Sequence, residues 1–545
     1  MADANEELPT LSSKAPHTTH LPGFYLWQVI SAVIGLLFVA PAAYLLSRSI
    51  QLGASFSSVV FAAATMGPLF RSLILAITVT LACAGLGTGL AWLVHRTNVR
   101  GHRVWAVLLP LPLVIPSFVY ATAIRHAFGP GGLIGWIPRP EGFLGAFVTL
   151  VVLSYPYVYL PVAGRLRRIS PSIEEGSRIL GASSARTFFS VVVPQAKGAI
   201  AAGSLLVFLY TISDFGAVSM MRYDTLTRAI FSTRLFDQAT AVSLGLLLAA
   251  LALLVGFGER WFRFDTDDGR PLIGSPRIYH LGKWSAPSSI GLATLSFVSL
   301  AAPVLVFLVW WTRGVSAPGG GYEGFLATIS RLGLPAINTA LVGVVAAVVA
   351  TVVVFPVAYA RRRGGSAVAG AASVSVIASF ALPGLVIALS IGFWALQVPA
   401  RWLYQSFPLL IVGYVVHFGA QSLRSTQASL DAVGTRFDEV AQTLQADQKR
   451  RLRTIDVPLM MPGVLAGGGL VMLSVMKELP ATLLLAPLGF ETLSTRIWNA
   501  AEDGFLAEVG VTSLLLILVS AVLTWTFVLR TEVEDSQADA GHSTA

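Results

Sequence analysis

Charged residues are scarce in this chain, and their scarcity excludes most soluble folds. Asp, Glu, Lys and Arg make up 12% of the 545 residues, whereas soluble proteins carry roughly 25%. Apolar residues make up 55%, and the mean hydropathy is +0.72. Apolar windows of about 20 residues, the length that crosses a bilayer as a helix, recur along the chain. The sequence therefore predicts an integral membrane protein.

Cysteine is almost absent, and so are the motifs of ATP and metal chemistry. The single Cys83 excludes a disulfide framework and a cysteine zinc site. No stretch reads Gly-x4-Gly-Lys-Ser/Thr, the loop whose backbone amides cradle phosphates. No paired carboxylates or activated nucleophile converge, so a membrane-embedded enzyme lacks support. We expect no catalytic residue, no metal site and no cofactor bound by this chain.

Long continuous apolar runs predict membrane-spanning helices and exclude a closed β-barrel, whose strands alternate over short segments. Twelve spans are predicted, in two sets of six. They fall near 24–47, 69–94, 104–128, 142–164, 194–221 and 240–258, and near 289–312, 335–360, 368–396, 404–423, 461–487 and 509–530.

Clusters of Lys and Arg predict the orientation, because cytoplasmic loops are enriched in both residues. With a cytoplasmic amino terminus, every cluster falls in an inside loop, and the outside loops are poorer in such clusters. The clusters are Arg96, Arg100 and Arg103; Arg165, Arg167 and Arg168; Arg260 and Arg263; Arg361, Arg362 and Arg363; and Lys449, Arg450, Arg451 and Arg453. We expect a multi-pass protein of the cell (plasma or inner) membrane with both termini in the cytoplasm. The net charge of +9 then reflects membrane topology, and no nucleic-acid partner is expected.

Composition divides the chain into two membrane domains, 23–258 and 289–530. Residues 1–22 are polar and contain prolines, which predicts a disordered cytoplasmic tail, and 531–545 forms a second tail. The segment 259–288 is rich in Asp, Gly and Pro, so we expect a cytoplasmic linker there.

The two membrane domains are predicted to be copies of one unit, because polar and proline landmarks recur 267 positions later. One block of the repeat is shifted slightly, to an offset of 264. The landmark pairs are Ser72 and Thr339, Ala91 and Ala358, Pro116 and Pro383, and the segments 223–226 and 490–493. An even number of spans separates the copies, so both have the same orientation. We expect an all-α membrane fold of two parallel six-helix repeats, with a pore between the halves.

An acid-led segment lies between the fourth and fifth spans of each half. Glu174 and Glu175 lead the first segment, and Asp438 and Glu439 lead the second. A proline follows nineteen residues after the second acid in each. Acidic side chains in a first turn stabilise the positive end of a helix, and Gly181 is typical of a helix end or bend. We predict a short amphipathic helix at the membrane face in each half.

These segments resemble the cytoplasmic loop of ABC importer permeases, whose signature is Glu-Ala-Ala, then Gly, then a hydrophobic residue and Pro. The resemblance implies the type I ABC importer permease fold, with 23–258 and 289–530 as its permease domains. It also implies an ATPase dimer that binds ATP and Mg, an extracytoplasmic solute-binding protein, and coupling helices that dock on the ATPase. Gln445 stands at the position of the signature glycine. The residues assigned to ATPase coupling are Glu174, Glu175, Gly176, Ser177, Gly181, Asp438, Glu439, Val440, Ala441 and Gln445.

Charged residues occur inside the fifth and eleventh predicted spans, where they are costly and usually line a pathway. Asp214 precedes Gly216, and Lys477 and Glu478 precede Pro480. Glycine and proline loosen a spanning helix, as a gate requires. Two interpretations remain open: these residues line an outer gate, or Lys477 pairs with a neighbouring acid to fix a helix end.

The segments 475–485 and 491–497, together with the fusion of two halves, resemble the permeases of ferric-iron importers. The resemblance implies ferric iron as the cargo, delivered by an extracytoplasmic binding protein. A fused permease for thiamine, a polyamine, sulfate or a phosphonate remains an alternative. A secondary transporter of the major facilitator type also has two parallel six-helix halves, but its characteristic loop carries an acid, and residues 94–103 contain none.

Overall fold

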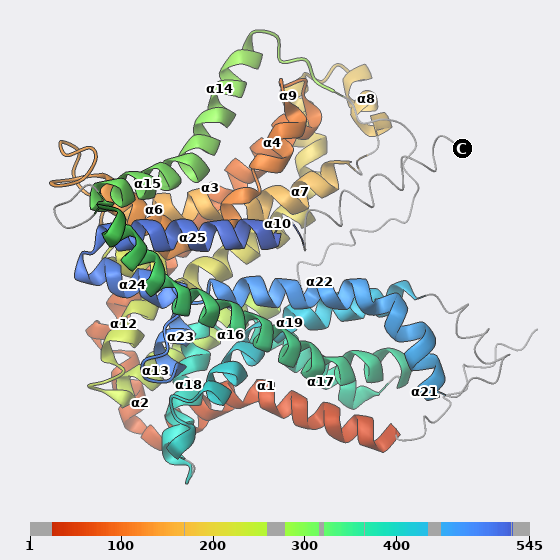
Figure 1. Cartoon of the computed structure of the whole chain (residues 1–545). Coiled ribbons are helices and arrows are strands. Elements are labelled where there is room, and N and C mark those ends of the chain that lie inside the picture. The colour runs from red at the N-terminus through yellow and green to blue at the C-terminus, as the bar shows by residue number, and fades with distance from the viewer. Residues whose placement is uncertain are drawn as a thin grey trace, which may run out of the picture.

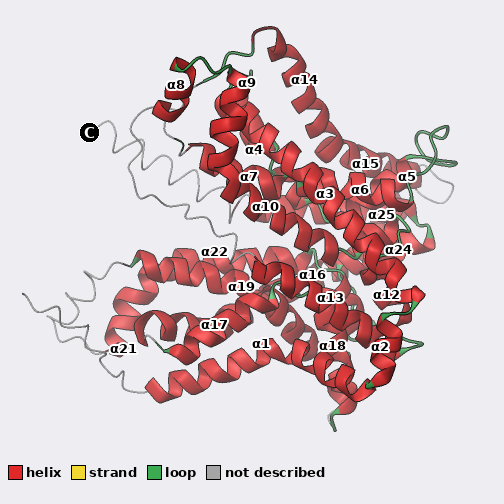
Figure 2. Cartoon of the chain, turned by 180° about the vertical axis from the view of Figure 1, so that it is seen from behind, coloured by secondary structure: helices red, strands yellow, loops and turns green. Residues whose placement is uncertain are grey.

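The computed structural model describes residues 24–167, 169, 171–258, 278–315, 321–364, 366–399, 401–433, 448–524 and 526. All elements in these ranges are helical, apart from two isolated β-bridges (Figures 1 and 2). The predicted tails 1–22 and 531–545 and most of the linker 259–288 lie outside the described residues. The same holds for the second acid-led segment with Asp438, Glu439, Val440, Ala441 and Gln445.

The first half runs from α1 to α13. Its elements are α1 (Phe24–Leu52), α2 (Ala54–Val60), α3 (Ala63–Arg96), α4 (His102–Leu108), η1 (Leu111–Val114), α5 (Ser117–Ala127), α6 (Gly142–Ser154), α7 (Pro156–Arg167), α8 (Pro171–Ile179), α9 (Ser184–Thr187), η2 (Phe188–Val192), α10 (Val193–Ser213), α11 (Gly216–Met220), α12 (Leu226–Thr233) and α13 (Gln238–Gly258).

The second half repeats this order. Its elements are η3 (Gly282–Trp284), α14 (Ser285–Ser296), η4 (Phe297–Ala301), α15 (Ala302–Val315), α16 (Gly321–Gly364), α17 (Ala367–Ser379), α18 (Gly384–Gln397), η5 (Arg401–Leu403), α19 (Phe407–Ala432), α21 (Gln448–Arg451), η6 (Leu452–Asp456), α22 (Val457–Met476), α23 (Pro480–Leu485), α24 (Leu493–Asp503) and α25 (Leu506–Thr524).

Within the described residues, nine helices are long and apolar enough to cross a membrane, or up to eleven if each of two bent helix pairs counts as one span. The predicted span 404–423 falls on α19, a further helix of 26 residues that packs against α16 and α22. The all-helical architecture expected from the apolar runs is confirmed.

Two predicted spans differ from the expectation of straight helices. In 104–128 the axis bends by 93° before α5, and in 368–396 it bends by 110° before α18. Pro116 and Pro383 directly precede α5 and α18. A proline has no amide hydrogen to donate, and it disfavours helical geometry in the residue before it. The paired proline landmarks therefore mark helix breaks.

Three helices form the core of each half, and the three helices of one half correspond to those of the other. In the first half α3, α7 and α10 pack against one another, and in the second half α16, α19 and α22 do. A Cβ atom on Gly203 of α10 would lie 2.6 Å from the Cα of Val158 on α7, and one on its counterpart Gly467 would lie 2.8 Å from the Cβ of Ser425 on α19. Such small residues let the backbones of membrane helices approach closely.

Hydrogen bonds show the repeat atom by atom. The Ser72 hydroxyl accepts a hydrogen bond from the Leu226 amide, and the Thr339 hydroxyl accepts one from the Leu493 amide. Both bonds are 2.8 Å long and both span 154 residues. The two landmark pairs found in the sequence thus hold the same long-range contact in each half.

The prolines that follow the acid-led segments also shape the two halves alike. Wide π-helical turns, η2 and η6, lie directly before the helices that carry Pro194 and Pro458 near their starts. A proline ring clashes with the carbonyl four residues earlier, so the turn before it opens. Each fifth span therefore begins with the same distortion.

The first span of each half packs partly on the other half. Helix α1 contacts α16, α17 and α18, and it lies beside the second-half bundle in Figure 1. Helix α15 packs on α25 of its own half and also on α5 of the first. The halves are therefore interleaved rather than merely side by side.

Candidate coupling and gate sites

Helix α8 (Pro171–Ile179) forms where the sequence predicts a surface helix. Proline at its first position is pre-set to the helical φ angle, and Glu174 in its first turn complements the positive helix end. Gly181, with a φ of 85°, follows the helix in the left-handed region that a side chain disfavours. The prediction that Gly181 marks the end of the helix is confirmed.

The two adjacent acids of α8 face different environments. Glu174 is fully buried and forms an ion pair of 3.0 Å with Arg96, at the end of α3. Arg96 also donates a hydrogen bond of 2.8 Å to the Leu166 carbonyl at the end of α7. Removing one member of such a buried pair costs about 3–5 kcal/mol, because the other charge is left unpaired. Glu174 therefore holds α8 in place rather than presenting a carboxylate to solvent.

The outer face of α8 combines one acid with exposed apolar side chains. Glu175 is exposed, and Ile179 and Leu180 are 86% and 88% exposed. Ile173 is 49% exposed on the same helix. Large apolar side chains that gather at an exposed site mark an interaction surface. We call Ile173, Glu175, Ile179 and Leu180 the α8 face.

The remaining predicted coupling residues of the first half lie behind or after this face. Gly176 and Ser177 are half-buried, and the Ser177 hydroxyl lies 3.3 Å from the hydroxyl of Thr187 on α9. Helix α8 is thus joined to the segment that leads into α10.

In the first half, the predicted gate residues lie at a break between two helices. Helix α10 ends at Ser213 and α11 begins at Gly216. The buried Asp214 accepts hydrogen bonds from the amides of Ala217 and Val218 through Oδ1, and from the Ser117 hydroxyl through Oδ2 at 2.5 Å. A Cβ on Gly216 would lie 2.7 Å from the Cβ of Phe118, so the break also packs tightly against α5.

In the second half, the corresponding break lies between α22 and α23. Helix α22 ends at Met476, and Pro480 opens α23. Glu478 accepts a hydrogen bond of 3.2 Å from the Ala481 amide, as Asp214 does from Ala217. A Cβ on Gly384 would lie 2.8 Å from Glu478 Oε1 and 3.0 Å from His417 Nε2. Gly384 corresponds to Ser117, so the missing side chain leaves room for the longer Glu478.

Lys477 joins the two halves at this level. Its ammonium group donates a hydrogen bond of 3.1 Å to the Leu113 carbonyl, 364 residues earlier in η1. Phe215, the neighbour of Asp214, lies across the same interface, with its ring 5.2 Å from that of Trp498 in the second half. The structure therefore brings the predicted gate residues of both halves together, and Lys477 bonds to a backbone carbonyl of the opposite half.

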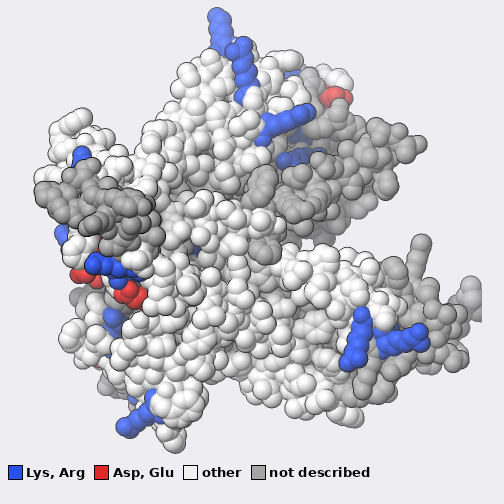
Figure 3. Space-filling model, viewed as in Figure 1, with Lys and Arg blue, Asp and Glu red and all other residues white. Residues whose placement is uncertain are grey.

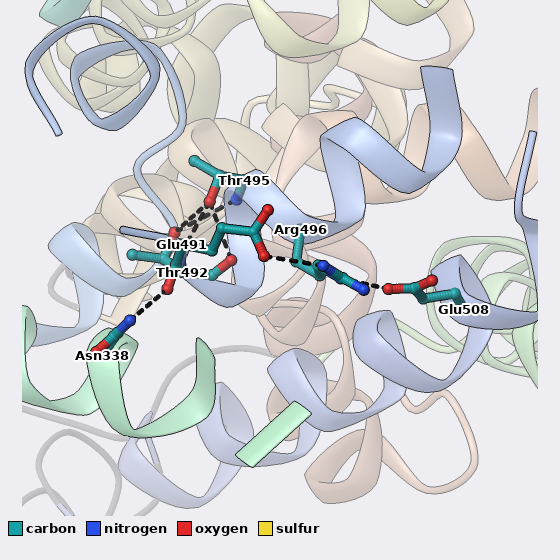
Figure 4. Close-up of polar contacts among 6 residues, drawn as sticks. All are labelled: Asn338, Glu491, Thr492, Thr495, Arg496 and Glu508. Carbon is teal, nitrogen blue, oxygen red and sulfur yellow. Dashed lines mark hydrogen bonds and ion pairs between the residues drawn. The ribbon is translucent and has the colours of Figure 1, made fainter. Parts of the chain in front are cut away.

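A second polar cluster, which the sequence did not single out as a site, surrounds the start of α24 (Figure 4). Asn338 donates to the Glu491 carbonyl, and Thr492 and Thr495 form a capping box. Arg496 pairs with Glu491 at 2.9 Å and with Glu508. Burial lowers the pKa of Arg496, but the hydrogen bonds that it donates to these two carboxylates raise the pKa overall.

The first half has a related cluster, in which Asp224 pairs with Arg71 and Arg228. Asp224 and Glu491 belong to the repeated segments 223–226 and 490–493, which is the signal in the sequence that could have located both clusters. Figure 3 shows acidic and basic side chains together near α24, on the side of the molecule away from α8 and α21.

In the part of the chain that the structure describes, no three or more His, Cys, Asp or Glu side chains lie close enough together to hold a metal ion. Cys83 is buried and free. We assign no metal site.

Comparison with known families identifies this architecture. The family described as "binding-protein-dependent transport system inner membrane component" matches residues 28–264 and 353–531. The chain belongs to this family. The two matches confirm the predicted fusion of two homologous halves, with the type I ABC importer permease fold in each.

Relatives of two lengths match. The Fe(3+)-transport system permease protein of Haemophilus influenzae is 31% identical over 92% of this chain and 97% of its own length. The ferric transport system permease protein of Actinobacillus pleuropneumoniae is 23% identical over 80% of this chain and 67% of its own. The molybdenum transport system permease protein of Mycobacterium tuberculosis is 29% identical, with 92% of its length matching 43% of this chain.

These matches confirm that the chain is a permease of the ABC importer class. It is a multi-pass membrane protein and a transport subunit rather than an enzyme. The assignments of individual coupling and gate residues remain predictions.

Proposed function

We propose that this chain moves ferric iron, delivered by an extracytoplasmic binding protein, across the membrane at the expense of ATP hydrolysed by a separate ATPase dimer. The supporting observation is the 31% identity to an Fe(3+)-transport permease over 92% of this chain and 97% of that protein. The match to a protein of this length includes both halves, whereas the molybdenum relative corresponds in length to one half.

The charges at the two helix breaks favour a cationic cargo over an oxyanion. Asp214 and Glu478 place two carboxyl groups at the interface between the halves, and Lys477 contributes one ammonium group. Rings of acidic side chains select cations in membrane pathways, and basic rings select anions. This balance supports ferric iron over the sulfate or molybdenum named for half-length relatives.

The ATPase dimer docks on the α8 face and, in the second half, on the segment with Asp438, Glu439, Val440, Ala441 and Gln445. Exposed Ile179 and Leu180 supply the apolar area for this contact, and Glu175 supplies the charge. ATP and Mg bind to that partner, and this chain binds no cofactor.

ATP binding closes the ATPase dimer and draws the two coupling helices together. The halves then move as rigid bodies, and the outer gate at Asp214, Lys477 and Glu478 opens where Gly216 and Pro480 interrupt the spans. The binding protein releases its cargo into the opened pathway, and hydrolysis resets the gate.

The α8 end of the molecule faces the cytoplasm in this arrangement, and both termini lie on the same side. The Lys and Arg clusters of the sequence support that orientation, because positively charged residues concentrate on the cytoplasmic side. Figure 3 shows basic side chains near α8 and α21, and others at the opposite end of the molecule.

The cargo is tested with the complete complex in proteoliposomes, with ATP inside and the binding protein outside. Uptake of radioactive ferric iron should exceed uptake of sulfate, molybdate, thiamine, a polyamine or a phosphonate, each supplied with the same set of subunits. Glu175→Arg should abolish uptake, whereas the matched Glu175→Asp retains a carboxylate and most of the uptake. Preferential uptake of any other cargo would contradict the proposal.

A further inference from the structure

The end of the connection between the halves, Ile278–Leu281, is attached to the first half rather than free of it. The Tyr279 amide donates a hydrogen bond of 2.8 Å to the Arg96 carbonyl, and the Tyr279 carbonyl accepts one of 3.1 Å from the Asn98 amide. The Leu281 amide donates to Asn98 Oδ1 at 2.9 Å. We call Ile278–Leu281 the linker end.

The side chain of Tyr279 extends this attachment to the coupling helix. It is 7% exposed, and its hydroxyl donates a hydrogen bond of 2.7 Å to Glu174 Oε2. The other carboxylate oxygen of Glu174 pairs with Arg96. The Tyr279 ring lies 5.7 Å from that of Trp92 on α3. Helix α8, the end of α3 and the linker end therefore share one buried polar cluster.

The linker end leads directly into the first span of the second half. The short helix η3 (Gly282–Trp284) follows Leu281, and α14 begins at Ser285. Through η4 and α15 this span reaches α25, the last span of the second half, and α5 of the first. The linker end thus connects α8 to the second half by a short path that includes hydrogen bonds.

A related contact exists at the start of α1. Trp27 lies 5.6 Å from Tyr359 on α16, and Tyr359 is the repeat counterpart of Trp92. The start of each half's first span is therefore held by an aromatic residue of the other half's second span. Tyr279 also donates the hydrogen bond to Glu174 described above.

We infer that the linker end is a mechanical connection, through which movement of α8 is passed to α14 and α15 of the second half. Tyr279 acts as a positioning residue in this connection, because its hydroxyl holds the coupling helix and its backbone is bonded to α3. The inference rests on the proposed docking of an ATPase on α8, since that docking supplies the movement.

Two variants test the two parts of the connection. Tyr279→Phe removes the hydroxyl and keeps the ring on Trp92. Insertion of two glycines after Leu281 keeps the Tyr279 contacts and loosens their connection to α14. The matched controls are Tyr223→Phe, whose hydroxyl makes an exposed bond of 3.4 Å, and the same insertion after Gly131 in an exposed loop.

Hydrogen exchange in lipid nanodiscs and iron uptake per ATP in proteoliposomes provide separate readouts. Tyr279→Phe should raise amide exchange in 171–180 by about tenfold, as the loss of one hydrogen bond to a charged group allows. The insertion should leave exchange in 171–180 unchanged. Both variants should lower uptake per ATP by about fivefold while ATP hydrolysis continues, which is typical of a lost coupling energy. The controls should match the wild type.

Unchanged exchange in α8 of Tyr279→Phe, or a wild-type uptake ratio in the insertion variant, would overturn the inference. A wild-type complex that hydrolyses ATP and imports no iron would instead contradict the proposed cargo. In that case the ATP-dependent change in exchange of α14 decides the inference: it should be present in the wild type and lost in the insertion variant.

Discussion

The two halves share one backbone scaffold but differ in the polar groups at the break in their fifth spans. The bonds from Leu226 to Ser72 and from Leu493 to Thr339 have the same length. At the break, however, the first half pairs Asp214 with Ser117, whereas the second half has Glu478 beside Gly384.

This difference shows which features the repeat must keep and which it can change. Each carboxyl group satisfies amides at the start of its own short helix, so the acid is retained in both halves. The groups around the acid can differ between the halves. Where the first half has Ser213, the second half has Lys477. The bond from Lys477 to Leu113 makes the interface between the two breaks asymmetric.

The largest difference in stability between the halves is expected when each of the two acids is replaced. Asp214→Ala should lower the free energy of unfolding by about 2–3 kcal/mol, because a hydroxyl and two amides lose a charged acceptor. Glu478→Ala should cost about 1 kcal/mol, since it removes the carboxylate that accepts the hydrogen bond from the Ala481 amide. Unfolding in mixed micelles of rising SDS content measures both. Equal losses would show that the two breaks are energetically alike.

The bond between the halves provides the next largest effect. Lys477→Met keeps a long side chain and removes the donor to Leu113, so the outer gate should open more readily. Hydrolysis of ATP without binding protein should rise about tenfold, as expected from about 1.5 kcal/mol for a charged hydrogen bond. The counterpart change Ser213→Ala is the control and should have little effect. Wild-type basal hydrolysis in Lys477→Met would exclude the bond as a gate contact.

A smaller effect is expected at the positions beside the acids. Ser117→Ala should cost about 1 kcal/mol, because Asp214 Oδ2 loses its donor. Gly384→Ala should cost no more than that, since the nearest atoms are the ends of the Glu478 and His417 side chains, and the largest loss would be the bond from the Ala481 amide to Glu478 Oε1. The same unfolding titration compares them. A greater loss for Gly384→Ala would mean that the second break is the more rigid one.

The smallest effect is expected at the opposite end of the bundle from α8. Arg496→Gln should cost about 0.5–1 kcal/mol at low salt, because Arg496 joins two partly exposed carboxylates. Arg228→Gln should cost about 0.3 kcal/mol, as for a single helical pair. At 1 M salt, where the screening length is about 3 Å, the two costs should converge. A difference that persists in high salt would point to packing rather than charge.

Much of the fold could be predicted from the sequence because its signals are local or periodic. Apolar runs located the long helices, the 267-residue offset located the repeat, and Pro171 and Gly181 bounded α8. The helix breaks at Asp214 and at Lys477–Leu479 follow from charged residues beside Gly216 and Pro480, which interrupt a spanning helix.

The features that sequence reasoning missed depend on contacts between distant residues. Nothing in the local pattern distinguishes Glu174 from Glu175, because the burial of Glu174 depends on Arg96 and on Tyr279, 105 residues away. The bond of Lys477 to Leu113 spans 364 residues. The packing of α1 against the second half also depends on which helices lie next to it, and hydropathy does not specify that.

In the proposed mechanism, a separate ATPase drives this chain through α8. The most direct measurement compares purified chain alone in vesicles, under an imposed ion gradient, with the complete complex supplied with ATP and loaded binding protein. We expect iron uptake only in the second case, and its loss in Glu175→Arg. Sustained uptake by the chain alone, driven by the gradient, would contradict the account.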